Sequence, residues 1–289
     1  MIADPLAFLH PAARAWFEAC FDGPTRAQAS GWPPIEAGQS TLLLAPTGSG
    51  KTLAAFLAAI NRLTFGPEPA PDRRCRVLYI SPIKALGVDI ERNLRAPLAG
   101  IAAVAERRGD AHRALSVGVR SGDTPPAERQ RLVRRPPDIL ITTPESLYLL
   151  LTSRAAEILR AVETVIVDEI HAVVASKRGT HLFLSLERLE ASRGADAAPL
   201  QRIGLSATQR PLDEVARLLG GGEVRGDRWT PRPVTVVDAG HRKALDLTVE
   251  VPVDDMAALA DAAPGGGDAG GSQAPSIWPA IHPRLVELV

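Results

Sequence analysis

The sequence predicts an α/β fold in which a parallel sheet is sandwiched between helices. Three observations lead to this class. Short apolar runs alternate with longer helical patterns, the runs are apolar on both faces, and a glycine-rich turn joins the first run to a helix. The composition agrees, because 45% of the 289 residues are hydrophobic and 23% are charged, as in globular domains.

The elements follow one another in a regular order. The predicted strands share apolar side chains on both faces and cover residues 41–45, 77–81, 115–119, 138–142, 164–167 and 203–206. The predicted helices share helical spacing of apolar residues and cover residues 53–63, 85–105, 127–133, 146–151, 181–191 and 212–219. A helix after each strand supplies the crossover that parallel pairing requires, so one parallel sheet is expected.

The last part of the chain has a different character. We expect the α/β domain to occupy residues 1–235, and residues 236–289 to hold a linker strand, a glycine-rich loop and the truncated start of a second domain. The strand is predicted at residues 246–253 and the flexible loop at 263–275. A helical apolar pattern follows the loop, with no further core sequence to bury it.

Charge and cysteine content exclude several classes of protein. The 33 basic residues balance 33 acidic ones, which argues against a histone-like basic binder but allows a local basic stripe. Two cysteines cannot form a disulfide framework or a four-cysteine zinc site. No apolar run approaches the roughly 20 residues needed to span a bilayer. We therefore expect a cytoplasmic protein without a membrane partner.

A candidate phosphate-binding loop follows the first predicted strand. It comprises Ala45, Pro46, Thr47, Gly48, Ser49, Gly50, Lys51 and Thr52. The glycines let successive backbone N–H groups turn toward phosphate oxygens, and the helix that follows adds its positive end. Lys51 can reach the outer phosphates, and the Thr52 hydroxyl can hold Mg²⁺. The strict pattern begins with glycine, whereas this loop begins with Ala45.

A pair of carboxylates follows the fifth predicted strand. Asp168 and Glu169 stand where that strand ends, and ligands of parallel sheets bind at this edge. Asp168 suits the role of a Mg²⁺ ligand, and Glu169 suits the activation of an attacking water. A plain helix start with acidic residues is the alternative reading of these two residues, but the upstream phosphate loop favours the catalytic one.

Seven motifs together resemble the superfamily 2 DExH-box helicases, in particular their large helicase-related (Lhr) group. They are PTRAQ, APTGSGKT, YISPIKALGVDIERNL, TPESL, DEIH, RGTHLFLSLERL and GLSAT, in the family's order over most of residues 16–210. The resemblance implies a P-loop NTPase fold of the RecA-like helicase type. It also implies ATP and Mg²⁺ as cofactors, ATP hydrolysis coupled to translocation on DNA, and a role in DNA repair.

The resemblance also implies roles for single residues. Gln28 would read the adenine edge, with Thr25 and Arg26 beside it. Either Phe17 or Phe21 would pack on the base, and a plain core position is the alternative for each. His171, Ser206 and Thr208 would couple the nucleotide to the bound strand. The implied nucleic-acid contacts share a place at the ends of predicted strands, and they are Pro82, Lys84, Arg120, Gly122, Thr143 and Glu145. DNA is favoured over RNA as the partner.

The resemblance further implies that the second RecA-like lobe, which supplies the arginine finger in the family, is missing from this chain. Losing such a finger costs on the order of 10³–10⁵ in rate. We therefore expect the chain alone to bind ATP and nucleic acid without unwinding a duplex. Two other functions stay open: a stand-alone P-loop ATPase or kinase, and an inactive truncated fragment or binding module.

Overall fold

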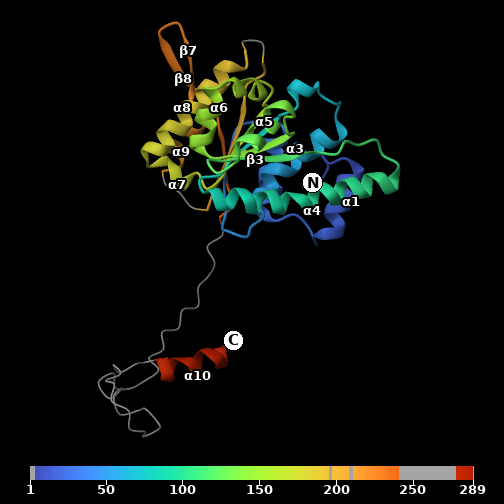
Figure 1. The fold of residues 1–289 in the computed structure, drawn as a ribbon. Coiled ribbons are helices and arrows are strands. Elements are labelled where there is room, and N and C mark those ends of the chain that lie inside the picture. The colour runs from blue at the N-terminus through green and yellow to red at the C-terminus, as the bar shows by residue number, and fades with distance from the viewer. Residues whose placement is uncertain (1–3, 195–196, 208–210, 241–277, 289) are drawn as a thin grey trace, which may run out of the picture. The chain divides into compact units, whose positions relative to one another are not determined.

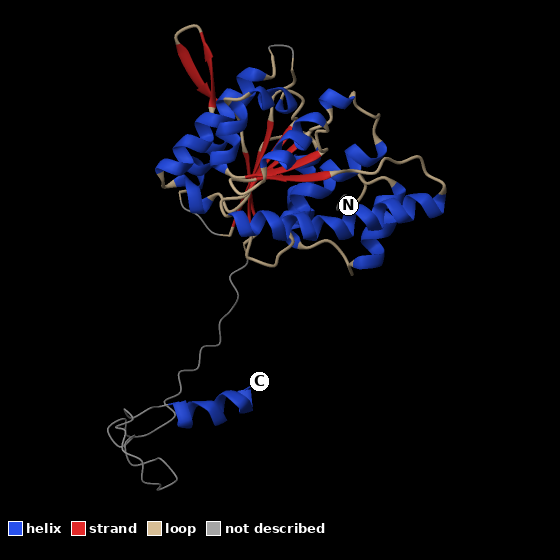
Figure 2. Cartoon of the chain, viewed as in Figure 1, coloured by secondary structure: helices blue, strands red, loops and turns tan. Residues whose placement is uncertain are grey.

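The computed structural model of this chain describes residues 4–194, 197–207, 211–240 and 278–288. These residues belong to two units, Met1–His241 and Arg242–Val289, and each is considered by itself. In the first unit, helices lie on both faces of a central sheet, as Figure 1 shows. Figure 2 separates the strands at the centre from the helices that cover them. The prediction of a parallel sheet sandwiched by helices is confirmed.

The central sheet has seven parallel strands in the order β3-β4-β2-β5-β6-β1-β9. The strands are β1 (Thr41–Leu44), β2 (Val77–Ile80), β3 (Val117–Arg120), β4 (Ile139–Thr142), β5 (Thr164–Val167), β6 (Gln201–Ser206) and β9 (Thr235–Asp238). All six predicted strands are present, with β3 beginning two residues later than expected. Because every strand runs in the same direction, the loops that follow them emerge at one edge of the sheet.

Three strands lie outside the predicted set. β9 pairs in parallel with β1, and β7 (Gly222–Arg225) forms an antiparallel hairpin with β8 (Arg228–Pro231). β9 alternates between half-buried and exposed residues, and β8 is exposed throughout. Strands of this kind lack the short runs of residues apolar on both faces by which the other six were predicted.

Four helices cover one face of the sheet. Side chains alternate between the two faces of a strand, so Leu43, Tyr79 and Ile141 all point to this face. They form one core with α1 (Pro11–Cys20), α2 (Arg26–Glu36), α3 (Lys51–Phe65) and α4 (Lys84–Arg108). Neither α1 nor α2 is among the predicted helices. α2 packs against α3, the helix that follows the phosphate loop, and α1 packs against α4, so this face supports the candidate site.

The opposite face has its own core. Leu42, Leu78 and Leu140, the sequence neighbours of the previous set, point to this side. The elements that cover it are α6 (Pro144–Leu151), η2 (Arg154–Leu159), α7 (His171–Val174), α8 (Lys177–Ser192) and α9 (Leu212–Gly220). A last helix, α5 (Pro126–Arg134), packs on the edge strand β3. A Cβ on Gly118 would lie 2.7 Å from Leu132 Cδ2, so the absent side chain permits this close approach.

Local sequence explains where several helices begin. Thr25, Thr143 and Ser176 stand before α2, α6 and α8, and each side chain accepts a hydrogen bond from the backbone N–H three residues later. Proline occupies the first turn of α1, α5 and α6, where its missing N–H costs nothing. Two of these caps belong to motifs of the candidate site.

The second unit is described over α10 (Trp278–Leu288). The strand expected at residues 246–253 and the loop expected at 263–275 lie outside the described residues. The division into residues 1–235 and 236–289 stays a prediction. Within the described parts of the chain, no helix is both long and apolar enough to cross a membrane.

Candidate functional site

A cleft of about 760 Å³ lies at the edge of the sheet where the parallel strands end. Residues of the phosphate loop, the acidic pair and α1, α2 and α4 line it. The sequence-predicted residues at its wall are Thr25, Gln28, Thr47, Gly48, Gly50, Lys51, Thr52, Asp168 and Glu169. The fold thus brings together, in one cleft, residues that lie more than a hundred positions apart in the sequence.

The phosphate loop depends on two glycines. Gly48 and Gly50 both have φ of 79°, a left-handed conformation that side chains disfavour. At Gly50, a lack of space is a second reason for glycine, because a Cβ there would lie 2.6 Å from the Gln28 amide nitrogen. The helix α3 begins at the next residue, so its free N–H groups face the loop. This is the geometry of an anion-binding turn.

The Lys51 ammonium group is held inside this turn. Its Nζ donates hydrogen bonds to the carbonyl oxygens of Ala45 and Pro46, and the side chain is buried. Burial lowers the pKa of Lys51, while the charges of Glu169 and Asp168 oppose that shift. Phosphate oxygens would offer the ammonium group stronger, charge-assisted hydrogen bonds than these carbonyl groups do.

Helix α2 is tied directly to the phosphate loop. The Thr25 hydroxyl donates a hydrogen bond of 2.7 Å to the Ser49 carbonyl oxygen. The Thr25 backbone N–H donates to Gln28 Oε1 over 2.9 Å, and the Gln28 N–H returns a bond to the Thr25 hydroxyl. This capping box fixes the Gln28 amide beside Gly50. Gln28, implied to read the adenine edge, and Thr25 beside it are therefore held at the cleft wall.

Phe17 in α1 and Phe21 directly after that helix are the two aromatic residues that could pack on a base, and they differ in exposure. Phe17 is fully buried in the core, whereas Phe21 is 42% exposed and lines the cleft. Trp16 lines the same wall and packs edge-on against Phe21, with ring centroids 5.9 Å apart. Phe21 is thus the aromatic ring available to a base, and Trp16 is a wall residue that the sequence did not single out.

Asp168 has a partner from another strand. Tyr79 of β2 donates its hydroxyl hydrogen bond to Asp168 Oδ2, and the Glu169 backbone N–H donates to Asp168 Oδ1 over 3.0 Å. The Tyr79 ring is buried and stacks on Phe56, with centroids 5.1 Å apart. Burial, together with the nearby Asp168 charge, raises the pKa of Tyr79 far above its usual value. The hydroxyl therefore stays protonated and donates to the carboxylate.

A chain of polar groups runs from Glu169 to β6. Glu169 has φ of 45°, the only positive value at a described residue other than glycine, and it places its carboxylate 3.2 Å from His171 Nδ1. The same nitrogen lies 3.3 Å from the buried Ser206 hydroxyl. The predicted coupling residues His171 and Ser206 are thus adjacent. Thr208, the third of them, lies outside the described residues.

The residues of the cleft suit Mg²⁺ that arrives with phosphates. Thr52 offers a hydroxyl oxygen and Asp168 a carboxylate oxygen, the hard ligands that this ion prefers, and both line the cleft. Among the described residues, no group of three or more histidine, cysteine, aspartate or glutamate side chains could hold a metal ion. Mg²⁺ usually takes one or two protein ligands and completes its shell with phosphates and water, so the donor set fits.

The loops implied to contact nucleic acid lie side by side. The Ser81 N–H donates to the Thr142 carbonyl oxygen, and the Thr142 hydroxyl donates to the Arg120 carbonyl oxygen over 2.7 Å. These bonds tie together the ends of β2, β4 and β3, where Pro82, Thr143 and Gly122 follow. The Lys84 backbone begins α4, and its side chain lies outside the described part of the structure.

Two arginines for which no role was predicted hold these loops, and one of them, Arg178, begins the motif RGTHLFLSLERL. Arg178 of α8 forms two hydrogen bonds with the Glu145 carboxylate. The hydrogen bond from Arg178 lowers the pKa of Glu145 to about 2. Arg129 donates to the carbonyl oxygens of Gly122 and Thr124 over 2.7 and 2.6 Å. The sequence shows only that these side chains are basic; their partners follow from the fold.

Comparisons with known proteins agree on one family. Residues 25–215 match the model of the DEAD/DEAH box helicase family. The chain is 53% identical over 287 residues to the Lhr helicase/probable uracil glycosylase of Mycolicibacterium smegmatis, covering 99% of this chain and 17% of that protein. It is 42% identical to the ATP-dependent helicase Lhr-Core protein 2 of Thermococcus barophilus, over all of this chain and 31% of that one. The chain spans less than a third of either relative.

Solved structures give the same picture. The helicase Lhr of Mycobacterium smegmatis bound to ssDNA and AMP-PNP matches 99% of this chain and 33% of that chain, with a TM-score of 0.78 and 52% identity. Mss116p bound to ssRNA and AMP-PNP matches 80% of this chain and 43% of that one, with a TM-score of 0.66 but only 18% identity, a likeness of fold alone.

Proposed function

The chain belongs to the DEAD/DEAH box helicase family, and from this premise we propose that it is the ATP-binding lobe of an Lhr-type motor that moves along DNA. One observation carries the proposal. The phosphate loop, the acidic pair, the His171–Ser206 contact and the bonded loops of β2, β3 and β4 all lie at one edge of one sheet. ATP chemistry and strand contacts would share this edge, as coupling requires.

In this proposal the phosphate loop binds and orients the triphosphate. Lys51 exchanges its bonds to Ala45 and Pro46 for phosphate oxygens, and the N–H groups at the start of α3 hold the others. Thr52 and Asp168 would hold Mg²⁺, which neutralises phosphate charge when bound. The Tyr79 hydroxyl fixes the orientation of the Asp168 carboxylate. Gln28 and Phe21 position the adenine.

In this proposal Glu169 is the general base of the reaction. Its carboxylate orients the attacking water and accepts a proton from it. His171 lies against this carboxylate and against Ser206 at the end of β6. A change in the charge or position of the Glu169 carboxylate would therefore be passed through His171 to β6. We propose that Thr208, in the segment after β6, belongs to the same coupling path.

The nucleic-acid partner is proposed to be a DNA strand. The helicase Lhr of Mycobacterium smegmatis was solved bound to ssDNA, and backbone-reading loops of this type need no base contacts. Pro82, Lys84, Arg120, Gly122, Thr143 and Glu145 would form or position those contacts. A role in DNA repair in the cytoplasm is part of the proposal and rests on the resemblance to Lhr helicases. Residues 236–289 would lead into a second RecA-like lobe.

The test measures ATP binding and ATP turnover by the purified chain, with and without single-stranded DNA or RNA. We expect the chain to bind ATP and the strand but not to unwind a duplex. Lys51→Ala should weaken ATP binding by roughly tenfold or more, since it removes charge-assisted hydrogen bonds. Lys177→Ala, at an exposed position at the start of α8, is the matched control and should bind ATP normally.

Other outcomes favour the alternatives. Turnover that no nucleic acid stimulates would support a stand-alone ATPase. Strand binding by a chain that does not bind ATP, with Lys51→Ala equal to the wild type, would support a binding module. Either result would contradict the proposed motor lobe.

A further inference from the structure

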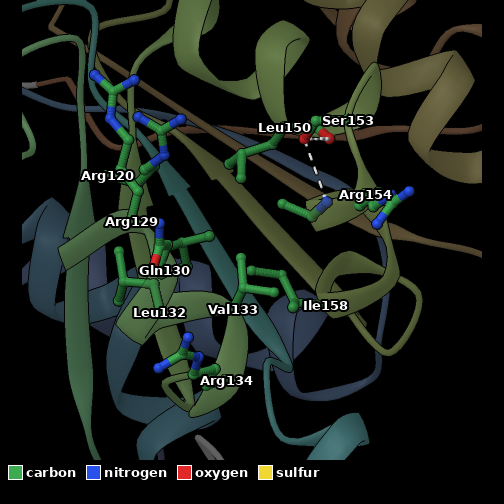
Figure 3. A pocket seen from close by; sticks show the side chains of 12 residues that line it. Arg120, Arg129, Gln130, Leu132, Val133, Arg134, Leu150, Ser153, Arg154 and Ile158 are labelled. Carbon is green, nitrogen blue, oxygen red and sulfur yellow. Dashed lines mark hydrogen bonds between the residues drawn. The ribbon is translucent and has the colours of Figure 1, made fainter. Parts of the chain in front are cut away.

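A second cavity, of about 360 Å³, lies away from the nucleotide cleft (Figure 3). Its wall is built by the end of β3, by α5, by β4 and by the segment that joins α6 to η2. The floor is apolar, because Leu132, Leu150 and Ile158 line it with buried side chains. Val133 also lines the cavity and is 41% exposed.

Arginines surround this apolar floor. Arg120, Arg129, Arg134 and Arg154 all line the cavity, and none of the twelve described residues that line it is acidic. Neither Arg134 nor Arg154 forms an ion pair with a carboxylate in the described part of the chain. Arg131, on the same helix but not on the cavity wall, does pair with a glutamate. The positive charge of the cavity is therefore left without a counter-charge.

The charges at the upper rim in Figure 3 repel each other. Arg120 and Arg129 lie together there, and each donates to backbone carbonyl oxygens rather than to carboxylates. Burial, with the Arg129 charge as a second cause, lowers the pKa of Arg120. An anion placed between them would relieve this repulsion, so the rim is suited to a negatively charged ligand.

We propose that this cavity takes one nucleotide of the bound strand, with the base on the apolar floor and the adjoining phosphates on the arginines. The inference rests on the proposed function and adds a base-sized subsite to it. Three features support a nucleotide. Guanidinium groups match phosphate geometry, the floor suits a flat apolar ring, and Gln130 offers an amide group to a base edge.

The place of the cavity in the fold favours a nucleic-acid strand over a protein as its ligand. Arg120 contributes both to the cavity and to the bonded loops at the edge of the sheet, through the hydrogen bond between its carbonyl group and Thr142. A strand that follows those loops would pass the opening of the cavity. An acidic peptide with an apolar side chain has related chemistry, and the experiment below treats it as a separate outcome.

The first experiment scans a single-stranded DNA oligonucleotide with one abasic position at a time, using fluorescence anisotropy on the full chain. If one base enters the cavity, one abasic position should weaken binding by roughly fivefold to tenfold, the size of one lost base contact. Val133→Asp should abolish this position dependence, because it supplies the cavity with its own carboxylate. Val133 is exposed, so the substitution leaves the core intact.

A matched pair of variants tests the arginines. Arg134→Glu should lower strand affinity by roughly tenfold at low salt and reduce the salt dependence. Arg135→Glu makes the same change of charge one residue later, at an exposed position that does not line the cavity, and should have a much smaller effect. Circular dichroism of both variants checks that the fold is retained.

The outcomes separate this inference from the proposed function. If the wild-type chain binds no strand at all, the proposed function fails, and this subsite fails with it. The strand could bind with an affinity that no abasic position changes, and Arg134→Glu and Arg135→Glu could lower that affinity equally. In that case only the subsite is overturned. Binding of an acidic, leucine-containing peptide that Arg134→Glu weakens, without an abasic effect on DNA, would overturn the nucleotide assignment and make the cavity a protein-docking site.

Discussion

At the scale of single residues, the hydroxyl group of Tyr79 is the buried partner of Asp168. Tyr79→Phe keeps the ring stacked on Phe56 but removes this hydrogen bond. We expect the free energy of unfolding to fall by about 1–3 kcal/mol, the usual cost of an unpaired buried group. The Mg²⁺ concentration needed for tight ATP binding should also rise, because Asp168 loses its orientation.

Tyr148→Phe is the control for this prediction. Tyr148 is the only other tyrosine, and it lies on α6 with 37% of its surface exposed. Urea unfolding and fluorescent-nucleotide binding at graded Mg²⁺ concentrations provide the two readouts. If both variants had the same free energy of unfolding and the same Mg²⁺ requirement for nucleotide binding, the Tyr79 hydroxyl would contribute nothing to the site.

The ion pair between Glu145 and Arg178 predicts a dependence of stability on pH. The pKa of Glu145 is lowered from 4.5 to about 2 in the folded chain. A carboxylate with a depressed pKa stabilises the fold above its unfolded pKa and loses this contribution as pH falls through the folded value. The stability difference between wild type and Arg178→Gln should therefore shrink between about pH 4.5 and pH 2.

The expected size of this effect is small. The Glu145 side chain is 57% exposed, and solvent screening limits such pairs to below about 1 kcal/mol. Thermal unfolding at several pH values measures it. In a Glu145→Gln background, Arg178→Gln should produce no such pH dependence, and a persistent one would assign the effect to another group.

At the scale of elements, the turn between β1 and α3 depends on Gly50 for two separate reasons, its positive φ and its contact with Gln28. Gly50→Ala should lower stability by more than the roughly 1–2 kcal/mol of a left-handed residue alone, and it should weaken ATP binding. Gly38→Ala is the matched control, because Gly38 has φ of 73° but open space around it. Differential scanning calorimetry and nucleotide titration would show equal effects if the Gln28 contact did not matter.

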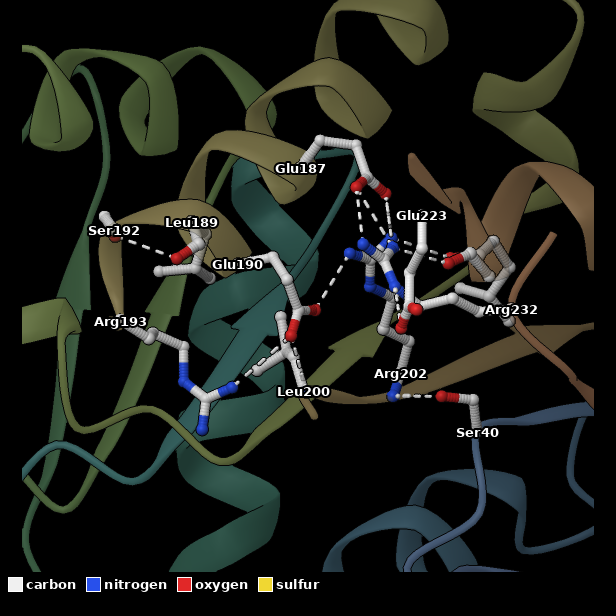
Figure 4. Close-up of polar contacts among 12 residues, drawn as sticks. Ser40, Glu187, Leu189, Glu190, Ser192, Arg193, Leu200, Arg202, Glu223 and Arg232 are labelled. Carbon is white, nitrogen blue, oxygen red and sulfur yellow. Dashed lines mark hydrogen bonds and ion pairs between the residues drawn. The ribbon is translucent and has the colours of Figure 1, made fainter. Parts of the chain in front are cut away.

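At the scale of the whole molecule, a cluster of ion pairs around the buried Arg202 and the shared Glu187 carboxylate connects three parts of the first unit (Figure 4). Arg202 of β6 is 1% exposed, and it donates to Glu187 and Glu190 of α8 over 2.7 and 3.1 Å. Arg232, which follows the β7–β8 hairpin, donates to the same Glu187 carboxylate. Burial opposes ionisation of Glu187, but the hydrogen bonds and charges of Arg232 and Arg202 outweigh it and hold its pKa below the usual value.

Arg202→Met should destabilise the chain by about 3–5 kcal/mol, because two carboxylates then lose a buried partner. Arg217→Met, which breaks an exposed ion pair of α9, should cost less than about 1 kcal/mol. Urea unfolding compares the two variants. A similar small cost for both would mean that water or the remaining arginines replace Arg202.

The sequence by itself determined the features that depend on residues close together in the chain. The phosphate loop from Ala45 to Thr52, the acidic pair after β5 and the alternation of strands and helices are local patterns, so neighbouring residues reveal them. The parallel sheet follows from that alternation, because each crossover needs a helix.

Only the tertiary structure decided which distant residues meet. The sequence left Phe17 and Phe21 as equal candidates, and packing against the core separates them. It gave no partner for Asp168, since Tyr79 lies 89 residues away, and it placed no cavity beside Arg134. Local conformation follows from local sequence, whereas contacts between strands and helices depend on how the whole sheet assembles, which no short pattern encodes.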